Sequence, residues 1–89
     1  MAHKSMKKIN SFLEDLLSSF DIVTIKHWQL EDKLPKFILL NYGRLHTSET
    51  VMRAWRRFKS DCNPFKNYYR WDIEEKMNKN QKEYIIKRR

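Results

Sequence analysis

The sequence predicts a small α+β domain of three or four helices followed by a C-terminal β-hairpin. Three features lead to this class: apolar residues repeat at helical spacing near the start, a later helix has one apolar and one cationic face, and aromatic residues alternate with polar ones near the end. At 89 residues the chain can bury one modest core but not a deep substrate cavity. We expect a single domain with a short flexible N-terminus over about 1–5 and a basic tail over about 87–89.

The first expected helix covers roughly 6–20. Apolar residues recur there every three or four positions, namely Met6, Ile9, Leu13, Leu16, Leu17 and Phe20. Ser11 and Glu14 also form an S-x-x-E capping-box pattern, so the regular helix could instead begin near Phe12. Either start places an amphipathic helix on the core.

A short strand is expected next, over residues 22–25. It would end at Thr24, which would cap a second helix running to about Asp32. Trp28 and Leu30 also suit an alternating strand, so both structures remain open for this segment.

Proline and glycine bracket the following segment. Pro35 suits the first position of a helix, and Gly43 suits the residue just past the end of one. These two residues frame Lys36 to Tyr42 as another short helix or a buried turn. Gly43 is the only glycine in the chain, which indicates a backbone position that needs positive φ.

The stretch from Arg44 to Lys59 predicts a helix whose two faces differ in chemistry. One side carries Val51, Trp55, Phe58 and Cys62, flanked by Met52 and Ala54, and the other carries Glu49, Thr50, Arg53, Arg56, Arg57 and Ser60. Ser48 or Thr47 can cap its first free N–H groups, and Pro64 cannot continue it. We expect this helix over about 48–60.

Two structures fit the C-terminal segment. Tyr69, Trp71 and Ile73 alternate with polar residues, Asn78-Lys79-Asn80 offers a turn, and Tyr84 and Ile86 resume the alternation, which together favour a β-hairpin. Residues 72–87 are also rich in helix formers, with Glu75/Lys79 and Glu83/Lys87 at helical pairing distance. The alternative fold is therefore a small all-α bundle.

The charge indicates an anionic partner. A formal net charge of +8 exceeds what solubility requires, and nucleic acid explains such an excess more often than an anionic membrane or an acidic protein. The longest apolar run, residues 37–40, is too short to span a bilayer, so we expect no membrane partner. One cysteine allows no internal disulfide, which fits a cytoplasmic location.

Gly43 to Lys59, as a turn and capped helix, and Tyr68 to Lys87, as a basic hairpin, resemble the winged helix-turn-helix family of DNA-binding domains. The resemblance implies that Arg53, Arg56 and Arg57 read the major groove and that Lys76, Lys79 and Lys82 touch the backbone from the wing. Low glycine with much lysine, isoleucine and asparagine is similar to small phage or viral proteins, for which the location would be the host cytoplasm or nucleoid.

The expected function is therefore binding to double-stranded DNA, as a transcriptional regulator or an accessory factor in replication or recombination. Thr47, Ser48 and Thr50 are candidates to bond phosphates at the helix start, although capping alone explains Ser48. The arginines could instead form a solvated face, with Glu49 pairing to Arg53. One small domain offers few base contacts, so a homodimer would help specificity.

Two other functions remain open. One is a protein-interaction module, such as a small viral inhibitor of a nucleic-acid-binding partner. The other is an RNA or single-strand binder, in which exposed rings would stack on bases; the candidate rings are Trp28, Trp55, Trp71, Tyr68 and Tyr69, and exposure of Tyr68, Tyr69 and Trp71 would favour it.

Catalysis is not expected. The only soft metal ligands are His3, His27, His46 and Cys62, and no two of them have the spacing of a metal site. Neighbouring carboxylates diverge on a helix or strand, and the sequence contains no phosphate-binding glycine loop. We therefore expect no enzyme activity, no cofactor, no metal and no small-molecule substrate.

Overall fold

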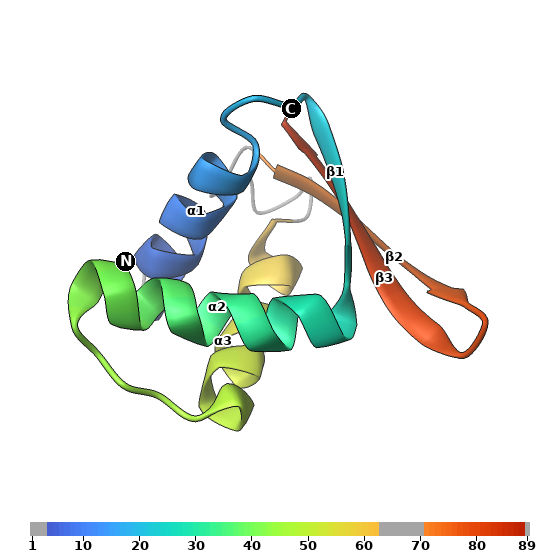
Figure 1. Cartoon of the computed structure of the whole chain (residues 1–89). Helices are drawn as coiled ribbons and strands as arrows, with labels where there is room; N and C mark the ends of the chain where they lie inside the picture. The colour runs from blue at the N-terminus through green and yellow to red at the C-terminus, as the bar shows by residue number, and fades with distance from the viewer. Residues whose placement is uncertain (1–3, 63–70, 89) are drawn as a thin grey trace.

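The computed structural model describes residues 4–62 and 71–88, with side chains described from Lys7 onward. The elements follow one another as α1 (Lys4–Leu16), β1 (Ile22–Lys26), α2 (His27–Tyr42), α3 (Ser48–Asp61), β2 (Trp71–Asn78) and β3 (Gln81–Arg88). The three helices lie on one side of the molecule, and an antiparallel sheet of order β1-β3-β2 lies along the other (Figure 1). The structure is thus a small α+β fold with a C-terminal hairpin, and the all-α alternative is wrong.

The core lies between the helices and the inner face of the sheet. Its largest fully buried side chains include Trp55 and Phe58 of α3 and Trp71 and Tyr84 of the hairpin. The rings of Trp55 and Tyr84 meet edge to face, with centroids 5.3 Å apart, so an aromatic contact joins α3 to the central strand. Ile86 on that strand pairs with residues of both neighbours and is completely buried.

Helix α1 begins and ends earlier than expected. Because it begins at Lys4, the Ser11 and Glu14 pattern lies inside the helix and is not a capping box, and Lys4 and Ser5, expected in a flexible N-terminus over 1–5, belong to the helix. The helix ends at Leu16, where Ser18 turns back and donates from both its N–H and its hydroxyl to the Asp15 carbonyl. Phe20 is consequently exposed and not part of the docking face.

The expected strand is confirmed, but it ends later and leads into a single long helix. Thr24 stays in β1, paired with Ile85, so it does not cap α2. The residue before the helix is Lys26, whose N–H donates to the Gln29 side chain at 3.0 Å. The end expected near Asp32 is also wrong, because α2 continues to Tyr42.

Pro35 lies in the interior of α2 and not at the start of a new helix. Proline removes one backbone hydrogen bond, which ordinarily ends or kinks a helix. Here Leu30, Leu34 and Ile38 are buried on both sides of the proline, so packing on the core holds the two halves together. The expectation for Gly43 is confirmed: its φ is +65°, and its N–H donates to the Leu39 carbonyl at 3.0 Å.

The hairpin closes through a two-residue turn, Lys79-Asn80, in which both residues have positive φ (51° and 65°). Ile73 pairs with Ile86, Glu75 with Tyr84 and Trp71 with Arg88. Tyr69 lies outside the described residues.

Strand β3 reaches Arg88, so Lys87 and Arg88 belong to the sheet and not to a basic tail. The Arg88 guanidinium donates to Glu14 of α1 at 2.9 Å and lies 5.0 Å from the centre of the Trp71 ring. These contacts tie the end of the strand to the helical layer. No helix in the described ranges has the length and apolar character needed to cross a membrane.

Candidate nucleic-acid interface

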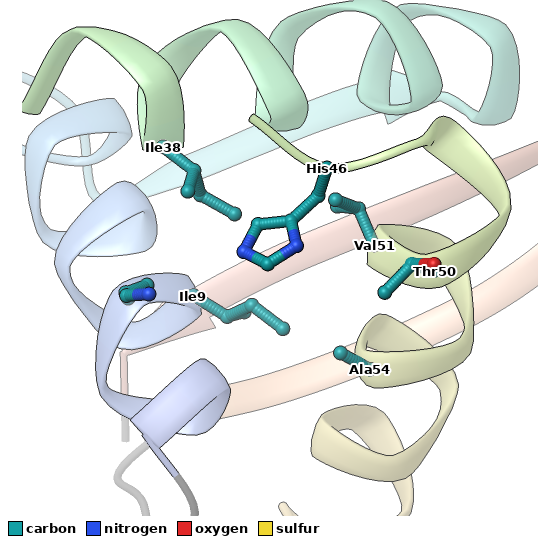
Figure 2. A pocket seen from close by; sticks show the side chains of 7 residues that line it. Ile9, Ile38, His46, Thr50, Val51 and Ala54 are labelled. Carbon is teal, nitrogen blue, oxygen red and sulfur yellow. The ribbon is translucent and has the colours of Figure 1, made fainter. Parts of the chain in front are cut away.

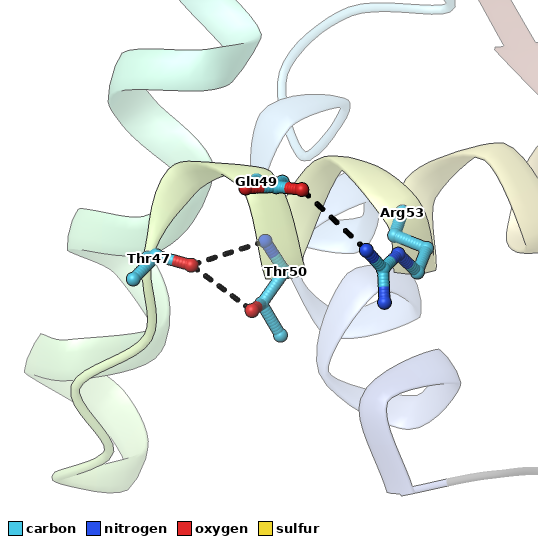
Figure 3. A network of polar contacts seen from close by, with 4 residues as sticks. All are labelled: Thr47, Glu49, Thr50 and Arg53. Carbon is cyan, nitrogen blue, oxygen red and sulfur yellow. Dashed lines mark hydrogen bonds and ion pairs between the residues drawn. The ribbon is translucent and has the colours of Figure 1, made fainter.

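The start of α3 is fixed by a threonine pair. Thr47 is the cap: its hydroxyl oxygen accepts the Thr50 N–H at 3.2 Å, and its O–H donates to the Thr50 hydroxyl at 2.9 Å (Figure 3). Ser48 is the first helical residue, so the expectation that capping explains Ser48 is wrong. The Thr50 hydroxyl accepts the hydrogen bond from Thr47, and a hydroxyl that accepts can still donate its own O–H to a phosphate.

The two-faced character of α3 is confirmed. The buried side carries Val51, Met52, Trp55 and Phe58, and Cys62 is buried at the helix end. The outer side exposes Glu49, Thr50, Arg53, Arg56, Arg57 and Ser60. The helix runs one residue past the expected end, to Asp61.

The three arginines of this face differ in their surroundings. Arg53 pairs with Glu49 one turn earlier, at 3.5 Å, and both side chains are well exposed (Figure 3). Such an exposed pair contributes little stability, about 0.3–0.5 kcal/mol. Arg56 and Arg57 form no ion pair within residues 7–62 and 71–88. These two guanidinium groups are therefore the most available to an anion.

The three wing lysines do not act as one cluster. Lys79 is exposed in the turn, and Lys82 lies in β3 opposite Met77, on the hairpin face that carries Glu75. Lys76 lies opposite Glu83, and the alternation of a strand places it on the other face. Lys76 and Lys82 therefore lie near the turn but on opposite faces of the hairpin.

A polar groove of about 300 Å³ separates α3 from the hairpin and the start of α2. Its walls are His27 and Glu31 of α2, Ser48, Glu49, Met52, Arg56 and Lys59 of α3, and Glu75, Lys82 and Tyr84 of the hairpin. Of the nine predicted site residues, the groove brings together Ser48, Arg56 and Lys82. The other six, Thr47, Thr50, Arg53, Arg57, Lys76 and Lys79, do not line it.

An ion-pair cluster joins the two walls of this groove. The Lys59 ammonium group on α3 donates to the Glu75 carboxylate on β2, and the Lys82 ammonium group lies 3.9 Å from the same carboxylate. The hydrogen bond from Lys59 is the main reason that the pKa of Glu75 lies below its usual value; nearby cationic charge adds to the effect, and partial burial opposes it. Sequence reasoning missed Lys59 and Glu75, because sixteen positions separate them and no local pattern links them.

A second polar contact closes the groove at α2. The Tyr84 hydroxyl and His27 Nδ1 are 2.8 Å apart, and His27 Nε2 lies 3.4 Å from Glu31. Burial raises the pKa of Tyr84 above its usual value, although the Trp55 indole beside it works in the opposite direction. The buried Trp55 N–H does not reach hydrogen-bond geometry with any described residue.

A smaller apolar pocket lies on the other side of α3, among the three helices (Figure 2). The His46 ring, from the loop between α2 and α3, points into it between Ile9 and Val51. At about 20 Å³ the pocket has space for no more than about one water molecule. Its role is packing of the loop. Within the described ranges no three His, Cys, Asp or Glu side chains cluster as a metal site.

The aromatic residues are distributed unfavourably for base stacking. Trp55 and Trp71 are buried, whereas Trp28 at the start of α2 is exposed. Tyr68 and Tyr69 lie outside the described residues. Comparison with protein-family models, curated proteins and solved structures found no significant match to this chain.

Proposed function

We propose that this chain is a winged helix-turn-helix domain that binds double-stranded DNA, with α3 as the recognition helix and the β2–β3 hairpin as the wing. The observation that carries the proposal is the outer face of α3, where Arg53, Arg56 and Arg57 are exposed on a capped helix in a chain of net charge +8. The order of helix, short strand, helix, capped helix and hairpin supports it. The mechanism is binding without catalysis.

Arginine and lysine have different roles in this proposal. Arg56 and Arg57, which lack described ion pairs, bond base edges or phosphates through their planar guanidinium groups. Lys79 at the turn reaches the sugar-phosphate backbone and supplies affinity without sequence preference. A homodimer would add a second recognition helix and thereby specificity, which suits a transcriptional regulator or an accessory factor of replication or recombination.

The first test is fluorescence anisotropy with a labelled random duplex over a series of salt concentrations. If four to six phosphates are engaged, log K against log salt has a slope of about −4 to −5 for B-DNA. Single-stranded DNA and RNA of the same length serve as competitors. Absence of duplex binding near 50 mM salt would refute the proposal.

Charge-matched variants test the surface. Arg56→Gln and Arg57→Gln each remove one positive charge from the outer face of α3, and Lys33→Gln removes one from an exposed position of α2. We expect each arginine variant to weaken duplex binding by about three- to tenfold and the lysine variant by less than twofold. Equal losses of duplex affinity in all three variants would show that the protein binds DNA only through its net charge and not through the outer face of α3.

A protein-interaction module remains the second candidate, because an apolar surface is exposed near the end of α2. Leu40 and Leu45 are 85% and 82% exposed, and Leu39 and Tyr42 lie close to them in sequence and are also exposed. Exposed apolar residues that form a contiguous patch often mark a protein contact. A chain that fails to bind any nucleic acid would move this candidate to first place. The single-strand candidate is weakened by the burial of Trp71.

A further inference from the structure

The groove between α3 and the hairpin is nearly balanced in charge, although the whole chain carries +8. Three carboxylates and three cations line it, namely Glu31, Glu49 and Glu75 with Arg56, Lys59 and Lys82. A surface built only to attract a polyanion would not place carboxylates between its cations. The position of each carboxylate therefore needs a physical reason.

Glu75 lies between the helix and the wing. Its carboxylate accepts a hydrogen bond from Lys59 of α3 and lies 3.9 Å from the ammonium group of Lys82 in β3. The side chains of Lys59, Glu75 and Lys82 are 25%, 36% and 42% exposed, so all three reach solvent, and the Lys59 ammonium group also lies 5.3 Å from the centre of the Tyr84 ring. The remaining neighbours in the groove are His27, Glu31, Arg56 and Tyr84, among others.

Resting on the proposed function, we propose that Glu75 occupies the position of one DNA backbone phosphate in the free protein. Its carboxylate holds Lys59 and Lys82 together, and a phosphodiester takes its place between the two ammonium groups in the complex. A phosphodiester, like a carboxylate, presents two charged oxygen atoms and a single negative charge. Lysine is a flexible point charge, so both groups can exchange one anion for the other by rotating their stems.

The proposal makes the Glu75 carboxylate a competitor of DNA. In the free protein Glu75 pairs with Lys59 and Lys82, and this pairing must break before the two lysines can bind the phosphate. In the complex the Glu75 carboxylate is a negative charge close to that phosphate and repels it. Glu75→Gln keeps the size of the side chain and a hydrogen-bond acceptor for Lys59, but removes the charge. We expect Glu75→Gln to bind random duplex about three- to tenfold more tightly near 50 mM salt, with a similar salt slope, because the same phosphate lies between Lys59 and Lys82 in both complexes.

Glu74→Gln is the matched control. It makes the same change in net charge on the adjacent residue of β2, and strand alternation places residue 74 on the opposite face of the hairpin, paired with Ile85. We expect less than a twofold change in affinity and an unchanged salt slope for this variant. Circular dichroism of both variants checks that the hairpin is retained.

Carboxyl ¹³C chemical shifts of Glu75, followed against pH, give a second measurement. In the free protein the pKa of Glu75 lies below its usual value. In the DNA complex we expect this pKa to rise, because the lysines move to the phosphate and the phosphate adds a like charge. An unchanged low pKa in the complex would show that Lys59 and Lys82 stay with Glu75, which overturns the proposal.

The two proposals fail in different ways. If the unmodified protein does not bind duplex DNA near 50 mM salt, the DNA-binding function is wrong and this inference falls with it. If the protein binds DNA but Glu75→Gln binds no more tightly than Glu74→Gln, only the inference is wrong. Weaker binding by Glu75→Gln would instead make Glu75 a residue that positions the wing.

Discussion

Replacing Tyr84 by phenylalanine tests the contact between α2 and the central strand. The substitution removes only the hydroxyl, which lies 2.8 Å from His27 Nδ1, and keeps the ring that packs edge to face on Trp55. An intramolecular hydrogen bond contributes about 0.5–1.5 kcal/mol net. The His27 side chain is 38% exposed, so in the variant its Nδ1 can form a hydrogen bond with water. We therefore expect the free energy of unfolding at pH 7 to fall by about 0.5–1 kcal/mol, in the lower part of that range.

The same variant has a defined pH dependence. Burial raises the pKa of Tyr84 in the folded protein above the ordinary value of 10.0, so the folded state favours the neutral phenol. The stabilisation linked to this shift is complete below about pH 10 and is lost as the pH rises through the folded pKa, because the unfolded chain ionises first. Phenylalanine does not ionise. The stability deficit of Tyr84→Phe should therefore narrow as the pH rises above about 10.

Urea denaturation followed by far-ultraviolet circular dichroism measures both effects. Tyr42→Phe is the control, since it removes an exposed hydroxyl that donates to Ser11 at 3.0 Å and should cost less at pH 7. A Tyr84→Phe variant as stable as the parent at pH 7 would contradict the hydrogen-bond argument. A deficit that stays constant from pH 9 to pH 11 would contradict the burial argument.

Three further substitutions test local features by thermal unfolding. Gly43→Ala should lower the free energy of unfolding by about 1 kcal/mol, because alanine is strained at φ +65°. The added methyl group meets no atom within 4 Å, so a steric clash does not contribute, and an unchanged stability would mean that the loop relaxes. Thr47→Ala should cost about 1 kcal/mol by removing the cap of α3, and Thr47→Ser should restore most of it. Cys62→Ser should lower stability by about 1 kcal/mol by placing a hydroxyl at a buried position, and rapid labelling of the native thiol would contradict this placement.

Sequence periodicity was sufficient for the elements whose signals are local. The faces of α3 follow from the 3.6-residue repeat that places Val51, Trp55 and Phe58 together. The hairpin follows from the alternation on both sides of Lys79-Asn80. Gly43 marks a helix end because its left-handed conformation is costly for other residues.

Tertiary packing decided the features that the sequence did not predict. The local rule that proline ends a helix is overridden at Pro35, because buried leucines before it and the buried Ile38 after it hold α2 against the core. The contact between Lys59 and Glu75 depends on where the hairpin folds back, which no nearby residue encodes. The exposed arginines of α3 could therefore be predicted one by one from the sequence. The groove between α3 and the hairpin could not, because it depends on how these elements pack.

The position of β3 between β1 and β2 has a consequence for folding. Both edge strands pair only with β3 in this sheet, and β1 meets it across about sixty residues of chain, as in the pair Ile22 and Lys87. The hairpin is a local contact and can form early. Pairing of β1 with β3 is slower, because the conformational entropy of the long intervening chain is lost before the strand contacts form. A break in β3 would unpair both neighbours at once, so we expect the sheet to be lost as one cooperative unit.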